Sequence, residues 1–239
     1  MDTELTILMP CLNEERTVEY CIRQALEFLH TRNVSGEVLI ADNGSIDCSA
    51  ERSRKSGARV ISVPERGYGS ALIAGINAAR GKYVIMADCD MSYDLLHLDG
   101  FLEKLRGGFP LVMGYRMDNI QPGAMPFSHR YIGVPALSLM GRLRFHTSVR
   151  DFHCGLRGFD REKALALGLS CKGMEFATEI IGKFALSGAQ IAEIPVTLSP
   201  DGRGKQSHLR TVRDGLRHMN YILFGSRRIK ESDLRMHSH

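Results

Sequence analysis

Long apolar runs are missing from this sequence of 239 residues: no stretch approaches the roughly 18 uninterrupted apolar residues that a transmembrane helix needs. The first residues, Met1 to Glu4, also lack the basic and apolar segments of a signal peptide. We therefore expect the chain to be cytoplasmic.

Cysteine pairing motifs are missing as well. The six cysteines are scattered and none forms a Cys-x-x-Cys pair, which argues against a disulfide framework and against a structural zinc site. Internal repeats and low-complexity segments are also absent. The chain has 44% apolar and 24% charged residues, which is enough to bury one large core. We predict one domain over residues 1–200 and a basic C-terminal extension over residues 201–239.

The positive charge is concentrated in this extension. Residues 203–239 hold nine Lys/Arg and three Asp/Glu, whereas residues 1–202 hold 22 and 24, so only the C-terminal segment is basic. A basic segment on a near-neutral body indicates an anionic partner such as a membrane surface, phosphate groups or nucleic acid.

Short apolar segments alternate with helical patterns in the first half of the chain. Strands alternating with helices form a parallel sheet with right-handed crossovers. We therefore predict an α/β, Rossmann-like fold with a mostly parallel sheet flanked by helices, and ligands beyond the carboxyl ends of its strands. The predicted strands cover residues 5–9, 37–41, 59–63 and 83–87, and the predicted helices cover 18–29, a segment from 47, and 70–79.

The second half is less regular. Strand patterns occur at residues 111–114 and 190–196, and helical patterns at 131–143 and 176–184. The glycine-rich segment 154–158 is assigned to no element. The sequence therefore predicts the later part of the sheet with less detail than the first part.

Two aspartates one residue apart, Asp88 and Asp90, directly follow the predicted strand 83–87. Two such carboxylates can bind one hard cation, and Mg²⁺ or Mn²⁺ readily bridges phosphate oxygens. Asp-x-Asp alone is short and equally describes a solvated acidic turn. Its position at the ligand edge of the predicted sheet favours a metal site.

Polar or glycine-rich segments follow the other three early strands. Pro10, Asn13 and Glu14 follow the first, Asp42-Asn43-Gly44-Ser45 follows the second, and Gly67-Tyr68-Gly69 follows the third. Each segment alone is ordinary turn and cap chemistry. Because the carboxyl ends of parallel strands meet at one edge, we expect all four segments to converge on one crevice.

Together these segments resemble the inverting nucleotide-sugar glycosyltransferases of the GT-A fold, and within them the dolichol-phosphate mannose or glucose synthase-like group. The resemblance covers about residues 5–220, and the order and spacing of the motifs are more specific than any one of them. The matching segments are residues 10–15, 42–47, 67–71 with Gly75 and 79–81, 88–90, 151–157, 193–195 and 203–207.

The resemblance implies transfer of a hexose from a UDP- or GDP-sugar, with Asp88 and Asp90 meeting Mg²⁺ or Mn²⁺ and the donor diphosphate. It implies that Arg203 and Lys205 close over the diphosphate. Relatives often carry aspartate where this chain has Asn43, so the preferred nucleotide base of the donor stays open. The remaining donor-binding residues implied are Pro10, Asn13, Glu14, Asp42, Asn43, Gly44, Gly69 and Cys89.

Three arginines are candidates for binding the acceptor. Arg116 and Arg130 match positions where lipid-phosphate members of the group place cations near the acceptor phosphate, and arginine forks bind phosphate bidentately. Arg157 could bind phosphate or form an ion pair with Asp151. The resemblance thus implies polyprenyl phosphate as the acceptor, with a small soluble acceptor as the alternative.

The need for a general base depends on that acceptor. A lipid phosphate oxygen is already anionic, so positioning matters more than proton removal. A hydroxyl acceptor would need a carboxylate, and Asp151, Glu175 and Glu179 are the candidates, although capping explains the two glutamates better. We expect Asp90, Arg116 and Asp151 to act in the reaction.

Residues 211–223 have the pattern of a basic amphipathic helix, with apolar residues at 212, 216, 219 and 223. The helix could lie on an anionic membrane at the inner face, or pack on the domain with its cations in water. Formation of a homo-oligomer stays open.

Three other functions fit less well. In a dinucleotide-dependent oxidoreductase, Gly67-x-Gly69 would continue to a third glycine, but Leu72 stands there. A nucleic-acid-binding protein could use the basic segment, yet the body is slightly acidic and contains no binding motif. A cysteine hydrolase would rest on Cys154 beside His153, but adjacent side chains usually diverge and no third member is evident.

Overall fold

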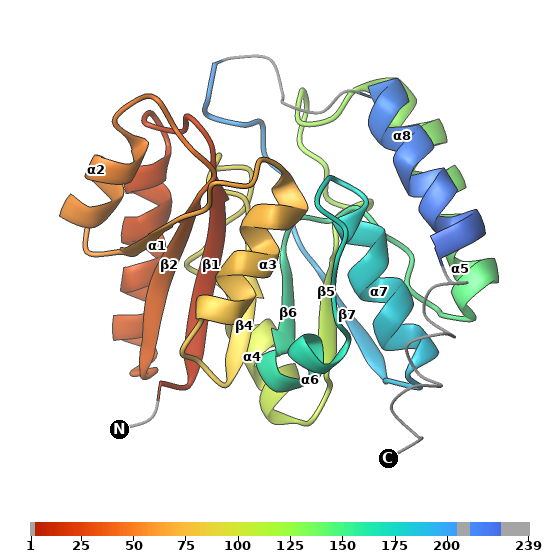
Figure 1. The fold of residues 1–239 in the computed structure, drawn as a ribbon, viewed down its shortest axis with the longest axis horizontal. Helices are drawn as coiled ribbons and strands as arrows, with labels where there is room; N and C mark the ends of the chain where they lie inside the picture. Colours follow the sequence, from red (N-terminus) through yellow and green to blue (C-terminus); the bar gives the residue numbers. More distant parts are fainter. Residues whose placement is uncertain (1–2, 205–210, 226–239) are drawn as a thin grey trace.

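The computed structural model describes residues 3–204 and 211–225 of the chain (Figure 1). The strands are β1 (Leu5–Cys11), β2 (Gly36–Asp42), β3 (Arg59–Ser62), β4 (Tyr83–Met86), β5 (Leu111–Tyr115), β6 (Arg157–Asp160) and β7 (Ile191–Pro195). The α-helices are α1 (Val18–Thr31), α2 (Ser49–Lys55), α3 (Tyr68–Ala78), α4 (Asp99–Arg106), α5 (Val134–Phe145), α6 (Arg161–Ala166), α7 (Phe176–Leu186) and α8 (Thr211–Asn220). Two π-helical turns, η1 (His129–Gly133) and η2 (Tyr221–Gly225), precede α5 and follow α8.

The strands form one seven-stranded sheet in the order β3-β2-β1-β4-β6-β5-β7. β3, β2, β1 and β4 run parallel, as do β5 and β7, whereas β6 is antiparallel to both β4 and β5. The predicted mostly parallel sheet is confirmed.

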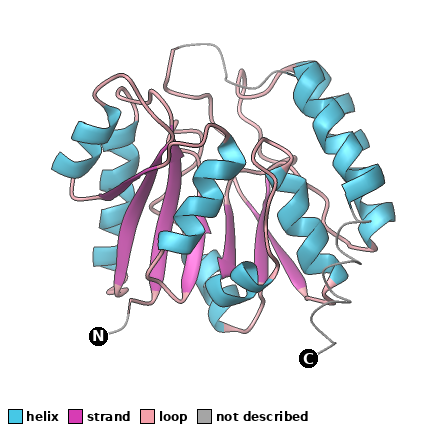
Figure 2. Ribbon diagram, viewed as in Figure 1, coloured by secondary structure: helices cyan, strands magenta, loops and turns pink. Residues whose placement is uncertain are grey.

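Helices cover both faces of the sheet (Figure 2). Alternate residues of β1 serve the two faces: Ile7 and Met9 pack in the cluster that contains residues of α1 and α4, and Leu8 packs with residues of α3 and α7. Because the central strands are buried on both sides, their sequences are almost continuously apolar. This explains why the early strands were predictable from sequence.

The structure adds three elements that the sequence analysis did not predict: α4, β6 and α6. β6 begins at Arg157, near the end of the glycine-rich segment 154–158, and its sequence Arg-Gly-Phe-Asp lacks the β-branched residues typical of strands. A glycine fits there because α4 packs closely: a Cβ on Gly158 would lie 3.0 Å from Leu105 Cδ1. Tertiary packing thus overrides local propensity at this strand.

No helix within residues 3–204 and 211–225 combines the length and the apolarity needed to cross a membrane.

Candidate active site

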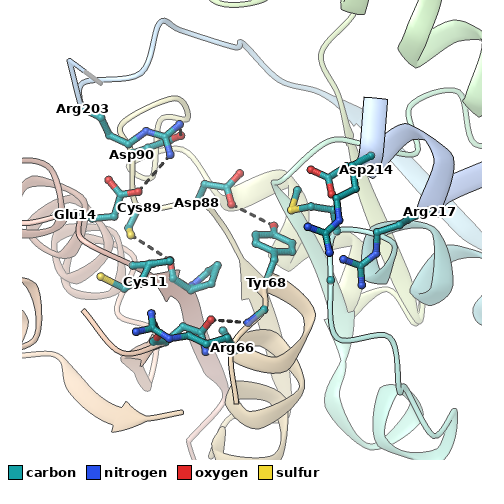
Figure 3. A pocket seen from close by; sticks show the side chains of 18 residues that line it. Cys11, Glu14, Arg66, Tyr68, Asp88, Cys89, Asp90, Arg203, Asp214 and Arg217 are labelled. Carbon is teal, nitrogen blue, oxygen red and sulfur yellow. Dashed lines mark hydrogen bonds and ion pairs between the residues drawn. The ribbon is translucent and has the colours of Figure 1, made fainter. Parts of the chain in front are cut away.

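A cavity of about 420 Å³ opens at the carboxyl edge of the sheet (Figure 3). Pro10 of β1, Asn43 after β2, Gly67 after β3 and Asp88 after β4 all line it, so the predicted convergence of four strand ends is confirmed. The loop before α7 and helix α8 form the opposite wall. Residues that the sequence analysis also assigned to the donor site and that line the cavity are Pro10, Glu14, Asn43, Asp88, Cys89, Asp90 and Arg203.

Asp88 lies in the middle of this cavity wall. Its Oδ1 accepts a hydrogen bond from the Tyr68 hydroxyl at 3.1 Å. Burial, and then repulsion by Asp90, raise the pKa of Asp88 to about 6. Gly155 packs against the same carboxylate, since a Cβ there would lie 2.2 Å from Asp88 Oδ2. Asp88 is therefore held in one position next to a second negative charge.

Arg203 lies between the carboxylates of Asp90 and Glu14 and contacts both. Its Nη2 lies 3.1 Å from Asp90 Oδ2 and its Nη1 lies 3.3 Å from Glu14 Oε1. Burial is the main reason why the pKa of Glu14 rises to about 7, with Arg203 opposing the shift and Asp90 adding to it. The arginine thus places a cation where a diphosphate would meet the Asp88 and Asp90 region.

The residues present fit a divalent cation. Within the described part of the chain no group of three or more His, Cys, Asp or Glu side chains could hold a metal ion. Mg²⁺, however, is commonly bound through one or two carboxylates together with substrate phosphates and water. Asp88 and Asp90 supply two carboxylates whose mutual repulsion a cation would relieve.

Asn43 fixes the loop that forms the lower wall in Figure 3. Its Nδ2 donates to the carbonyls of Val63 and Glu65 at 3.1 and 2.7 Å, and its Oδ1 accepts from the Gly67 N–H at 2.8 Å. Arg66 in this loop donates to the Asn43 carbonyl at 2.8 Å and lines the cavity. Arg66 was missed because nothing in a loop sequence marks which residue turns inward.

Four residues expected in the donor site do not line the cavity. Their contacts and backbone conformations position the segments around it. Asn13 Oδ1 accepts from the Ile46 N–H at 2.9 Å, and Asp42 Oδ1 accepts from the Ser45 N–H at 3.2 Å. Gly44 has a φ of +83°, a conformation that favours glycine. A Cβ on Gly69 would lie 1.9 Å from the Cys171 carbonyl oxygen, so glycine is required there by close packing. Lys205 lies outside the described residues.

Arg116 and Asp151 form a buried ion pair beneath the cavity rather than lining it. Arg116 Nε lies 2.8 Å from Asp151 Oδ2, and the two side chains are 10% and 0% exposed. Arg116 Nη1 also donates to the Tyr93 hydroxyl at 3.4 Å. In this arrangement Asp151 is a partner of Arg116, not a carboxylate free to take a proton.

Arg157 and Arg130 also differ from the expectation. Arg157 is 1% exposed and donates to the carbonyls of Cys154 and Ala177, while Asp151 is paired with Arg116, so the ion-pair alternative for Arg157 is wrong. Arg130 lies in η1 with its guanidinium 5.3 Å from the centre of the Tyr131 ring. Neither residue lines the cavity.

The cysteine hydrolase alternative finds no support in the geometry. The Cys154 thiol contacts the Tyr93 hydroxyl and the Leu156 carbonyl, and burial raises its pKa to about 11. Both ring nitrogens of His153 are buried without a hydrogen-bond partner among the described residues. The thiol is therefore protonated and lacks a base.

Helix α8 is docked on α7 by polar contacts. Arg217 Nη2 lies 2.8 Å from Glu175 Oε1, and His218 Nδ1 lies 2.8 Å from Thr178 Oγ1. Ile222, which follows the helix, is 1% exposed. The packing alternative is thus only partly right, because the face of Asp214, His218 and Ile222 is buried, whereas Leu216 and Leu223 are 55% and 48% exposed.

This docking predicts loss of stability in acid. Burial lowers the pKa of His218 to about 4, below the usual value near 6.5, so the unfolded chain binds more protons between these values. The contribution of His218 to stability should be fully present above about pH 6.5 and fall by up to about 3 kcal/mol as the pH drops to 4, whereas the raised pKa values of Glu14 and Asp88 act in the opposite direction. Urea unfolding of His218→Gln should show a shallower loss over this range. His30→Gln, at an exposed position of α1, should match the parent; an identical slope for His218→Gln would contradict the prediction.

Comparisons with known proteins show the family of this chain. The family model described as glycosyl transferase family 2 matches residues 6–167. The hexosyltransferase Agl6 of low-salt glycan biosynthesis in Haloferax volcanii is 35% identical over 92% of this chain. The chain spans only 53% of the length of Agl6.

Two further proteins extend the comparison. A dolichyl-phosphate hexose transferase of Haloferax volcanii is 30% identical, over 81% of this chain and 82% of that protein. Glucosyl-3-phosphoglycerate synthase of Mycobacterium tuberculosis, solved with Mn²⁺, UDP-glucose and glycerol 3-phosphate, superposes with a TM-score of 0.71 at 22% identity, covering 92% of this chain and 79% of that one. This likeness, at 22% identity, shows the fold alone. On the family match and on the identity to these relatives, the chain belongs to glycosyl transferase family 2.

Proposed function

We propose that this chain transfers a hexose from a nucleotide diphosphate sugar to a lipid phosphate of the polyprenyl type, with inversion at the anomeric carbon. An oxygen of the acceptor phosphate forms the new bond to that carbon. The bond to the diphosphate oxygen breaks, and its electron pair leaves with the nucleoside diphosphate. The name of the dolichyl-phosphate hexose transferase relative supports this acceptor class.

Mg²⁺ or Mn²⁺ would be held by Asp88 and Asp90 and, when bound, supplies positive charge to the leaving diphosphate. Arg203 adds a second cation at the same place, since it already contacts Asp90 and Glu14. Asn43 holds the Arg66 loop at the end of the cavity that would receive the nucleoside. Binding and charge neutralisation at one end of the cavity thus prepare the sugar for attack from the other.

The three carboxylates considered as general bases favour a phosphate acceptor over a hydroxyl. Asp151 is paired with Arg116, and Glu175 is paired with Arg217. Glu179 accepts from the backbone N–H groups of Ser170 and Cys171. None of the three lines the cavity. A phosphate oxygen needs no such base because it is already anionic.

The observation that supports a lipid acceptor most directly is an exposed apolar surface beside the cavity. It lies on two neighbouring segments, 127–143 and 216–224, whose helices α5 and α8 contact each other (Figure 1). Large apolar residues at helical spacing normally face a core, whereas these face outward. The residues, between 48% and 74% exposed, are Phe127, Tyr131, Ile132, Leu139, Leu143, Leu216, Leu223 and Phe224. Such a surface fits the interfacial region of a membrane at its cytoplasmic face.

The test is transfer of radiolabelled sugar into extractable lipid. UDP- and GDP-hexoses would be supplied with Mn²⁺ or Mg²⁺ and vesicles containing dolichyl or undecaprenyl phosphate. We expect label in the organic phase, and its loss on chelation of the metal. Transfer only to a water-soluble hydroxyl acceptor would reject the lipid phosphate.

A variant separates the membrane contact from the chemistry. Leu139→Glu with Leu143→Glu places charges on the exposed face of α5, where burial in lipid is costly. Transfer to vesicle-borne acceptor should drop about tenfold or more, since two such charges cost over 1.4 kcal/mol. Transfer to detergent-dispersed short-chain acceptor should persist. Equal rates on vesicles would count against the membrane surface.

A further inference from the structure

Helix α8 contributes cations to the active-site cavity on the side away from the diphosphate region. In Figure 3, Asp214 and Arg217 lie across the cavity from Glu14, Asp90 and Arg203, with Asp88 and Tyr68 between the two groups. Arg213 lines the same wall. An acceptor approaching from α8 would therefore meet the sugar opposite its leaving group.

The cations of this cavity differ in how far carboxylates neutralise them. Arg203 contacts Glu14, Asp90 and Asp201, so its charge is shared among three carboxylates. Arg213, by contrast, is exposed and has no carboxylate within ion-pair distance among the residues that the structure describes. Arg213 can therefore offer its full charge to a ligand.

Arg217 is positioned rather than free. Glu175 holds its Nη2 at 2.8 Å, and Gly173 lies directly against the pair. A Cβ on Gly173 would stand 2.5 Å from Arg217 Nη2 and 2.6 Å from Glu175 Oε2. The guanidinium has further N–H donors than the one that Glu175 uses, so it can hold an anion while it stays oriented.

A second, shallow and open hollow continues from these arginines, and its described lining residues all belong to the one segment 213–224 of α8 and η2. Arg213 and Arg217 line both hollows, and the second, of about 700 Å³, is otherwise largely apolar. Its further lining residues are Leu216, Met219, Asn220, Leu223 and Phe224. A charged end and an apolar groove in series match an amphiphile with an anionic head and a hydrocarbon chain.

We propose that Arg213 and Arg217 bind the phosphate of the acceptor and that the groove of Leu216, Leu223 and Phe224 holds the first isoprene units. This inference rests on the proposed lipid phosphate acceptor and specifies its binding site. It differs from the role that the family resemblance implies for Arg116, whose guanidinium is occupied by Asp151 and lies outside the cavity lining.

Binding of farnesyl phosphate, measured by calorimetry on the full chain, tests the phosphate site. Arg213→Gln should weaken its affinity roughly tenfold, because a charge-assisted hydrogen bond contributes about 1.5–3 kcal/mol. Arg213 has no ion pair with any described residue to lose, so folding should be unaffected. Arg213→Lys should recover part of the affinity. Arg54→Gln, an exposed arginine of α2, is the matched control and should bind like the parent.

The groove is tested with chain length. Leu223→Ser should weaken farnesyl phosphate but leave dimethylallyl phosphate, which has one isoprene unit, much less affected. Farnesol, without phosphate, should bind poorly to every variant. Affinity for the nucleotide of the donor should stay constant throughout, which separates the acceptor site from the donor site.

Two results would overturn the assignment. Unchanged farnesyl phosphate affinity in Arg213→Gln and Arg217→Gln, together with its loss in Arg116→Gln of intact fold, would move the phosphate to Arg116 while transfer to lipid phosphate stands. A parent chain that binds donor and glycosylates a hydroxyl acceptor, yet ignores farnesyl phosphate, would reject the proposed function itself.

Discussion

Asp90→Asn is expected to reduce kcat/KM by about 10² to 10³-fold, the loss seen when one preorganised electrostatic contact to a developing charge is removed. The amide keeps the size of the carboxylate and can still accept the hydrogen bond from the Ser92 N–H, so the loop should keep its shape. What is lost is one negative charge facing Arg203 and the proposed cation. Steady-state kinetics with varied Mn²⁺ should show a higher metal requirement as well as a lower rate.

Asp94→Asn provides the matched control. Asp94 is four residues away and its side chain is 52% exposed beside His97. The activity of Asp94→Asn should equal that of the parent. The melting temperatures of Asp90→Asn and Asp94→Asn should both lie close to that of the parent. An Asp90→Asn enzyme with full activity would remove the basis for the metal assignment.

The largest expected effect on stability comes from the buried ion pair. Asp151→Ala leaves the Arg116 guanidinium buried without its carboxylate, which should cost about 3–5 kcal/mol in the free energy of unfolding. The double variant Arg116→Met with Asp151→Leu should recover much of this loss, because it removes both charges together. Urea unfolding gives the free energies, and the cycle of the parent, Arg116→Met, Asp151→Leu and the double variant gives the coupling between the two side chains.

An exposed ion pair provides the comparison for this result. Lys55 Nζ lies 2.7 Å from Glu51 Oε1, and the two side chains are 71% and 62% exposed, so Glu51→Gln should leave the free energy of unfolding nearly unchanged. If Asp151→Ala cost no more than Glu51→Gln, the Arg116–Asp151 pair would be solvated rather than buried.

The first half of the fold could be predicted because its strands are buried on both faces. β1, β2 and β4 appear in the sequence as apolar runs bounded by turns, and their polar carboxyl ends locate the cavity. β6 could not be recognised, since it pairs antiparallel to β4 and β5 through residues brought together only by the tertiary fold. A four-residue strand that contains glycine carries almost no local signal.

The candidate site likewise contains residues that the sequence could locate and residues that it could not. Asp88, Asp90 and Glu14 follow strands closely, so the rule for parallel sheets places them correctly. Arg213 and Arg217 reach the cavity because α8 docks through His218 and Ile222, and only contacts with α7 decide which helix face turns inward. The periodicity of apolar residues left open whether Leu216 and Leu223 would face a membrane or the domain.

Asn43 limits how donor preference could be redesigned in this chain. Aspartate at this position would set a carboxylate against two carbonyl oxygens and remove both donated hydrogen bonds. The loop 63–67 would then keep only the contacts of the Gly67 N–H and of Arg66 to residue 43. An exchange of nucleotide specificity should therefore replace residue 43 and this loop together, because a point change alone would weaken the contacts that position the loop.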